Sequence, residues 1–204
     1  MPRATLLAGL ALLIACAAQA ADHRLPADDP VNSAATSLWH VTAPDPPTLF
    51  LQVGDEAPAF SYLGPDGGWH EFKDLSAHRS LLLIFGARQE DLRSLEEARS
   101  LFHDLGVTPV VVIDRRTGAA ASLARRLELS CPIITDPICA IGDLFNSLDP
   151  LSRHHAPAFF VVDEARTIRA LGHGVLPSPI QMLWVTARGL GRPLPESAWS
   201  VFSG

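Results

Sequence analysis

Cysteine is scarce in this sequence, and its placement limits the chemistry the chain can perform. The 204 residues include three cysteines, Cys16, Cys131 and Cys139, and none lies between the first two. Cys131 opens the run CPIIT, which predicts a strand, and we expect Cys139 in the first turn of the following helix. The strand would separate the two by roughly 13 Å at ~3.3 Å per residue, whereas a disulfide needs Cα atoms within ~7 Å. We therefore expect free thiols and no disulfide.

Basic clusters and membrane-length apolar runs are also missing. The 16 Lys and Arg residues are outnumbered by 22 Asp and Glu residues, which gives a net charge of −6, and the basic residues form no block. This balance predicts that nucleic acid is not a partner. The apolar stretch at residues 4–15 is about a dozen residues long, against the ~20 that a membrane-spanning helix requires.

This N-terminal stretch is typical of a secretory signal peptide over residues 1–20. Arg3 supplies a basic start, and the letters AQA at residues 18–20 form a small-x-small cleavage site. A second hypothesis is a bacterial lipobox, because LIAC at residues 13–16 would make Cys16 the lipidated first residue. Either route predicts an exported protein, periplasmic or secreted, that contacts a membrane only if Cys16 carries lipid.

The rest of the chain divides by composition into a tether, one domain and a tail. Residues 21–49 are rich in Pro, Asp, Ala and Ser, which is typical of a flexible tether. Residues 50–192 carry the apolar patterns of a single globular domain, and residues 193–204 form a C-terminal tail.

The domain is organised around a short apolar run and the helix that follows it. Residues 81–85 are all apolar and predict a strand buried on both faces. After a turn at Gly86, apolar residues recur three to four positions apart, which predicts one long helix that ends at Gly106. The residues on its apolar face are Leu92, Leu95, Ala98, Phe102 and Leu105.

The remaining patterns predict a layered α/β domain. Extended segments at residues 60–63 and 69–72 flank turn-forming residues and predict an N-terminal β-hairpin. Further strands are predicted at residues 107–114, 133–136, 158–163 and 168–172, and further helices at 119–127, around Ile138, Ile141 and Phe145, and at 178–190. The resulting order predicts a central mixed sheet with helices on both faces, three layers in all.

Several short motifs follow one another along this domain. They are VGDEAPAF at 53–60, GGW at 67–69 with KDL at 73–75, LLLIFGA at 81–87, CPIITDP at 131–137, and AP at 156–157 before AFFVVD at 158–163. Their order resembles the redoxin branch of the thioredoxin-like superfamily, which contains alkyl hydroperoxide reductases, thiol-specific antioxidant proteins and exported thioredoxin-like oxidoreductases. The resemblance covers roughly residues 51–190. It implies a thioredoxin-like fold in which Ala156 and Pro157 form a cis-proline loop facing the active-site helix.

The resemblance also implies a reactive thiol at the start of the active-site helix, where this chain has no cysteine. Dithiol members carry C-x-x-C at the start of the active-site helix, where this sequence has Glu90-Asp91-Leu92-Arg93. Peroxidatic members carry Pro, then Thr or Ser, then Cys, where the nearest register here offers Gly86 and Arg93. Glu90 and Arg93 therefore mark a degenerate site. Acids at a helix start contribute ~0.3–1 kcal/mol each, so a structural role accounts for Glu90, with Arg93 as its surface partner.

Cys131 and Cys139 remain as candidates for thiol chemistry. A first-turn helix position lowers a thiol pKa, which makes Cys139 the better candidate. The opposing hypothesis is that Cys139 is a small buried residue beside Ile138 and Ile141, and Cys131 is expected to be inert. A peroxiredoxin-like antioxidant or oxidoreductase that uses either cysteine stays open as an alternative.

Histidines provide two candidate metal sites. His154 and His155 directly precede the Ala156-Pro157 loop and, beside the acidic helix start, could hold copper or zinc; a solvated polar loop is the alternative. If the leader is removed after residue 20, the mature chain has His23 at its third position. Such an N-terminus can bind Cu(II) or Ni(II) in a square plane.

These features together predict a protein that binds a partner and does not catalyse a redox reaction. We expect an exported thioredoxin-fold redoxin homologue that acts as a binding or accessory module. Its contact surface would be the cleft between residues 86–93 and Pro157, with an unidentified protein or small molecule as partner. Beyond copper at the histidines, no cofactor is expected.

Overall fold

The computed structural model describes residues 50–64 and 67–202, with side chains up to Trp199. The expected leader, the lipobox at Cys16, the tether and His23 lie outside these residues. Within the described ranges, every helix is too short or too polar to cross a membrane.

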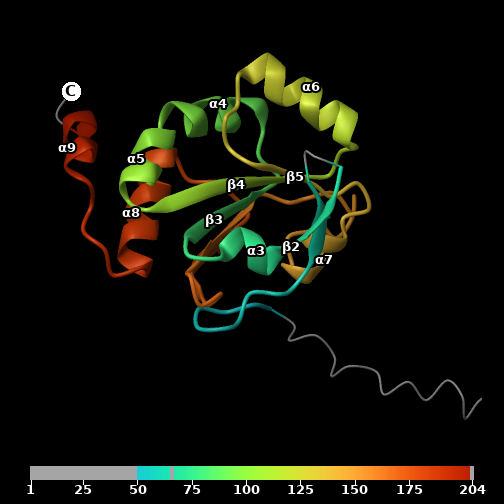
Figure 1. The fold of residues 1–204 in the computed structure, drawn as a ribbon, viewed down its shortest axis with the longest axis horizontal. Helices are drawn as coiled ribbons and strands as arrows, with labels where there is room; N and C mark the ends of the chain where they lie inside the picture. The colour runs from blue at the N-terminus through green and yellow to red at the C-terminus, as the bar shows by residue number, and fades with distance from the viewer. Residues whose placement is uncertain (1–49, 65–66, 203–204) are drawn as a thin grey trace, which may run out of the picture. The chain divides into compact units, whose positions relative to one another are not determined.

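A five-stranded mixed sheet forms the middle layer, with strand order β5-β4-β3-β6-β7 (Figure 1). The central strand β3, Ser80–Phe85, is buried along its whole length, as its apolar run predicts. It pairs in parallel with β4, Val107–Ile113, which pairs in parallel with β5, Ile133–Thr135. On its other side β3 pairs antiparallel with β6, Ala158–Val162, which pairs antiparallel with β7, Ile168–His173. The carboxyl ends of β3, β4 and β5 and the start of β6 therefore meet at one edge of the sheet.

Helices α4, α5, α6 and α8 pack against one face of the sheet (Figure 1). Their bounds are Gln89–Glu97, Arg99–Asp104, Thr117–Leu127 and Pro179–Gly189. Their apolar residues form one core with Leu82 and Ile84 of β3, which point to the same side of the strand. Helix α8 begins with the predicted cap, because the Ser178 hydroxyl accepts a hydrogen bond from the Gln181 amide at 3.4 Å.

The prediction of one long helix up to Gly106 is wrong, because α4 and α5 are separate helices. Ala98 lies between them with φ −90° and ψ 0°, outside helical geometry. Just before the break, the Glu96 carboxylate accepts hydrogen bonds from the amides of Ser130 and Cys131 at 2.9 and 3.3 Å. These bonds anchor the end of α4 to the segment that enters β5, and the chain changes direction before α5 begins.

A hairpin and two short helices cover the opposite face. These elements are β1 (Ser61–Leu63), β2 (Trp69–Glu71), α3 (Phe72–Ser76) and α7 (Ala140–Leu144). Aromatic rings build the core on this side: the Phe145 ring centroid lies 5.4 Å from that of Phe85 and 5.0 Å from that of Phe160. The predicted hairpin and the three layers are thus confirmed.

The predicted apolar face of α7 is wrong at its first member. Ile138 is 83% exposed, whereas Ile141 and Phe145 are buried. The difference arises because α7 begins only at Ala140, and Cys139 before it has a left-handed backbone with φ 58°. That conformation turns the chain, so Ile138 does not continue the helical face.

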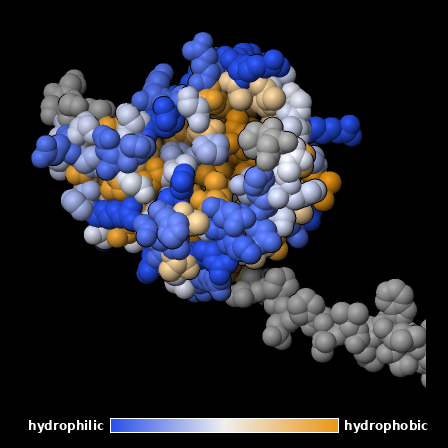
Figure 2. All heavy atoms as spheres, in the orientation of Figure 1, coloured by the Kyte–Doolittle hydropathy of each residue, from blue (hydrophilic) through white to orange (hydrophobic). Residues whose placement is uncertain are grey.

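The C-terminal segment is held to the domain by Arg192, by a hydrogen bond from the Ser197 hydroxyl to Asp104 Oδ2 at 2.8 Å, and by burial of Ala198. The Arg192 guanidinium donates hydrogen bonds to the carbonyls of Leu105 and Gly106 at 3.1 and 3.2 Å, and to the Ser80 hydroxyl at 3.1 Å. Helix α9, Glu196–Phe202, follows. On the face shown in Figure 2, hydrophilic residues dominate the periphery and apolar residues are visible nearer the middle.

Candidate functional site

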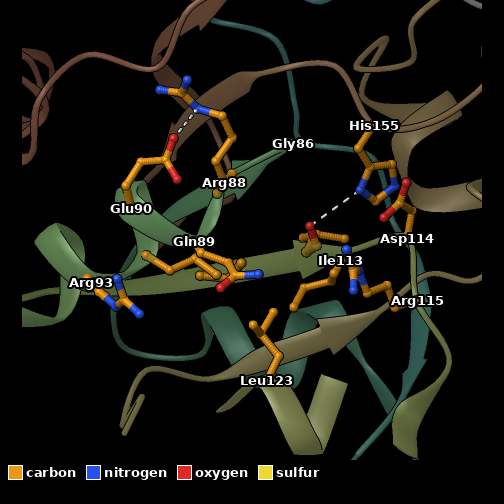
Figure 3. A pocket seen from close by; sticks show the side chains of 14 residues that line it. Gly86, Arg88, Gln89, Glu90, Arg93, Ile113, Asp114, Arg115, Leu123 and His155 are labelled. Carbon is orange, nitrogen blue, oxygen red and sulfur yellow. Dashed lines mark hydrogen bonds and ion pairs between the residues drawn. The ribbon is translucent and has the colours of Figure 1, made fainter. Parts of the chain in front are cut away.

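A cavity of about 550 Å³ lies where β3 and β4 end and α4 begins (Figure 3). Residues of the turn before α4 form one wall, and Asp114 and His155 lie at the opposite end. Ligands in open α/β sheets bind at the carboxyl ends of the strands, so this cavity occupies the expected place for a functional site.

Gly86 brings the turn before α4 against the loop that contains Pro157. Its backbone has φ 62°, and an added Cβ would lie 2.5 Å from the Ala156 carbonyl carbon and 2.6 Å from the Pro157 nitrogen. Only glycine allows both this conformation and this approach. The structure thus brings together the two segments that the sequence predicted to face each other.

The family resemblance implied a cis peptide bond before Pro157, but the described residues contain no cis peptide bond. The trans form is the intrinsically favoured one for X–Pro bonds. Hydrogen bonds fix the loop in this form: the Ala156 amide donates to the Ser147 carbonyl at 2.7 Å, and the Gly174 amide donates to the Pro157 carbonyl at 2.8 Å.

The acids at the start of α4 are paired with Arg88, and not with Arg93 as the sequence suggested. Arg88 Nε lies 3.2 Å from Glu90 Oε1 and 3.2 Å from Asp91 Oδ2. The Arg88 amide also donates to Asp91 Oδ2 at 2.9 Å, which supplies one half of a capping box. Glu90 and Asp91 therefore have structural partners, and Arg93 lines the cavity with no ion pair to a described residue.

His155 and Asp136 form a buried pair beneath the cavity. Their side chains are each 2% exposed, and His155 Nε2 lies 3.0 Å from Asp136 Oδ2. The Gly142 amide donates to the same oxygen at 2.9 Å. Burial raises the pKa of Asp136, but hydrogen bonds from His155 and from the amides of Gly142 and Ile141 outweigh it, and the pKa lies below its usual value.

This pairing decides how His155 can act. Its Nδ1 lies 3.3 Å from the Val112 carbonyl oxygen, so both ring nitrogens face acceptors. A doubly protonated ring can donate to both, whereas a neutral ring can donate to one. No nitrogen is left for a metal, so the predicted shared site of His154 and His155 is not formed.

His154 turns to a different carboxylate. Its Nδ1 lies 2.8 Å from Asp114 Oδ2, and its side chain is 71% exposed. Asp114, Cys139 and His154 each offer a metal-ligating atom, and these atoms lie within 4.8 Å of one another. Asp114 and Asp136 were not predicted as site residues. Each directly follows a strand at the same edge of the sheet, which is the signal that could have identified them.

Neither cysteine of the described chain lines the cavity. Burial, together with the carboxylates of Asp136 and Asp114, raises the pKa of Cys139. The predicted activation by a helix start is therefore wrong: Cys139 precedes the short helix α7, and the nearby acids act in the opposite direction. Burial raises the pKa of Cys131 to about 11, which disfavours its thiolate; its expected inertness stays a prediction. Both thiols are free.

Comparisons with known proteins agree with the architecture. The AhpC/TSA family model matches residues 53–171. Peroxidoxin BcpB from Mycobacterium tuberculosis has a TM-score of 0.61 at 13% identity, over 69% of this chain and 97% of that one. AhpC from Enterococcus faecalis has a TM-score of 0.61 at 14% identity, over 68% and 92%. Reduced 2-Cys peroxiredoxin from Plasmodium vivax has a TM-score of 0.56 at 18% identity, over 69% and 98%. A search of curated protein sequences gave no significant match. At these identities the structural likeness establishes a thioredoxin-like fold, and function has to be argued from the site.

Proposed function

The chain belongs to the AhpC/TSA family, and from that premise we propose that it is an exported, catalytically degenerate member that acts as a binding or accessory module. The observation that carries this proposal is the composition of the helix start. Residues 86–93 contain glycine, alanine, arginines, glutamine, acids and leucine, and no cysteine. Thiol redox turnover requires a thiolate nucleophile, and none of these side chains supplies one.

The cavity between the helix start and the Pro157 loop is the proposed contact surface. Its walls combine apolar side chains such as Leu92 and Leu123 with hydrogen-bonding groups such as Gln89. Arg93 and Arg115 also line it and form no ion pair with described residues, so their guanidinium groups can donate hydrogen bonds to a carboxylate or carbonyl of the occupant. A protein segment or a small molecule with such groups fits this description.

The rival proposal is a thiol-dependent antioxidant or oxidoreductase that uses Cys139 or Cys131. Two observations weigh against it: neither thiol lines the cavity, and both have a raised pKa. A raised pKa lowers the fraction of thiolate, which is the reactive form.

A peroxide-reduction assay distinguishes the two proposals. We would measure hydrogen peroxide consumption with dithiothreitol as reductant, and insulin disulfide reduction, for the wild type, Cys131→Ser, Cys139→Ser and the double variant. We expect all four to match the rate without protein. Turnover in the wild type that disappears with either cysteine would overturn the proposal and favour the rival.

Export is tested separately by the mature N-terminus. After expression in a Gram-negative host, intact-mass analysis of the periplasmic protein should give a chain that begins at Ala21. A lipidated chain that begins at Cys16 would instead support the lipobox, and an unprocessed cytoplasmic chain would refute export.

A further inference from the structure

Three different metal-ligating side chains meet beside the cavity, at the edge where the strands end. Asp114 directly follows β4, Cys139 directly precedes α7, and His154 lies in the loop before β6. One ligand atom from each lies within 4.8 Å of the other two. We infer that the protein binds a zinc ion through Asp114, Cys139 and His154.

The donor set matches the chemistry of zinc. A thiolate sulfur, an imidazole nitrogen and a carboxylate oxygen are its usual ligands, and hard cations such as Mg²⁺ and Ca²⁺ prefer oxygen alone. The three residues come from three separate segments of the chain, so the fold and not the local sequence brings them together. Three protein ligands leave a fourth position for water.

The distances require only a small adjustment. Zinc–ligand bonds of about 2.0–2.3 Å at tetrahedral angles place ligand atoms about 3.3–3.8 Å apart. The three ligand atoms, which lie within 4.8 Å of one another, therefore have to approach by up to about 1 Å. His154 is 71% exposed and can rotate toward the ion without disturbing the core. In the structure its Nδ1 is instead bonded to Asp114 Oδ2 at 2.8 Å, a hydrogen bond that zinc would replace.

The backbone and the surrounding charge support the same arrangement. Cys139 has φ 58°, and Arg153, which precedes His154, has φ 60°, so left-handed residues set the direction of two of the three ligands. The Arg153 guanidinium lies 3.4 Å from the Asp143 carboxylate, which offsets the positive charge next to His154.

Binding involves proton release and no electron transfer. The Cys139 thiol gives its proton to solvent as the zinc–sulfur bond forms, and waters leave the ion as the His154 and Asp114 atoms enter. Zinc stays divalent throughout. The site uses neither His155, whose nitrogens are engaged, nor the start of α4, and of its three ligands it shares only Asp114 with the cavity.

Cobalt(II) is the probe that reports the thiolate directly. Titration of the reduced, metal-free full chain with Co²⁺ should produce tetrahedral ligand-field bands and a thiolate-to-cobalt charge-transfer band that saturate at one ion per chain. Addition of Zn²⁺ should abolish both. Absence of the charge-transfer band at saturating Co²⁺ would overturn the inference.

Variants assign the ligands. Cys139→Ser should lose the charge-transfer band, whereas Cys131→Ser and Cys16→Ser, which remove the other thiols, should keep it. His154→Gln and Asp114→Asn should each weaken Co²⁺ affinity at least about 100-fold, since loss of an outer-sphere partner alone costs about 10–100-fold. We expect His154→Gln to fold, because the His154 side chain is exposed, and circular dichroism checks this. A band that survives in Cys139→Ser, or an unchanged affinity in folded His154→Gln, would refute the site.

Discussion

Replacement of Asp136 by asparagine tests whether the buried pair with His155 stabilises the domain. The substitution keeps the size of the side chain and removes its charge. Asp136 Oδ2 accepts from both His155 Nε2 at 3.0 Å and the Gly142 amide at 2.9 Å, and both side chains are 2% exposed. Loss of such a buried acceptor costs about 1–3 kcal/mol, because its hydrogen-bond donors are left unsatisfied. That is a large share of the roughly 5–15 kcal/mol that stabilises a typical domain.

Urea unfolding at pH 7, followed by circular dichroism, measures this cost. With a slope of about 2 kcal/mol per molar urea, the midpoint should fall by about 1 M. Asp143→Asn is the matched control, because Asp143 likewise pairs with one basic side chain, that of Arg153, but both side chains are 67% exposed. A surface pair of this kind contributes about 0–1 kcal/mol. Equal midpoints for the two variants would refute the importance of the buried pair.

The pH dependence gives an independent measure of the same interaction. The pKa of Asp136 is lowered in the folded chain relative to its usual 3.8, so the carboxylate stabilises the fold above that value. This contribution is lost as the pH falls through the lower, folded pKa. The difference in unfolding free energy between the wild type and Asp136→Asn should therefore shrink as the pH falls below 3.8. A difference that grows in acid would contradict the sign of the shift.

Two further predictions concern Gly86 and the thiols. In urea unfolding, Gly86→Ala should destabilise the domain by at least about 1–2 kcal/mol because of its left-handed backbone alone. The cost should be larger still, because the new Cβ would lie 2.5 Å from the Ala156 backbone. Gly174→Ala is the control and should cost less, because Gly174 also has a positive φ but has open space around it. In iodoacetamide labelling at pH 8 followed by peptide mass spectrometry, Cys131 should react about 100-fold more slowly in the folded than in the unfolded chain, because its pKa rises from 9.0 to about 11 and the thiolate is the reactive form. Half-buried Cys139 should be labelled first, and faster labelling of Cys131 would contradict its burial.

The sequence was sufficient for the layers of the fold. Residues 81–85 form a fully buried strand because an unbroken apolar run is satisfied only between two covered faces. The hairpin and the Ser178 cap were predictable because turn and capping residues act over a few positions. The break at Ala98 was not, because it accompanies contacts of Glu96 with residues more than thirty positions away.

The position of the site was predictable, but the hydrogen-bond partners of its histidines were not. The helix start and the Pro157 loop do face each other, as the family resemblance implied. The partners of His154 and His155 could not be predicted, because the start of β6 meets Asp114 and Asp136 only once β6 pairs with β3, β3 with β4 and β4 with β5. A metal site shared by the two histidines was one hypothesis and a solvated loop the other, and in the structure each histidine turns to a different acid. The left-handed backbone at Cys139 was likewise not evident from its residue type, and it changed the expected effect of the helix on that thiol.

Asp114 stands between the two places where this molecule is proposed to bind something. Its side chain contributes to the cavity wall and also contacts His154 on the outer side. Its negative charge therefore acts on both compartments at once, and neutralising it from one side alters the attraction felt on the other. Thermodynamic linkage makes that influence mutual: whatever factor an ion imposes on the affinity for a cavity occupant, the occupant imposes on the ion.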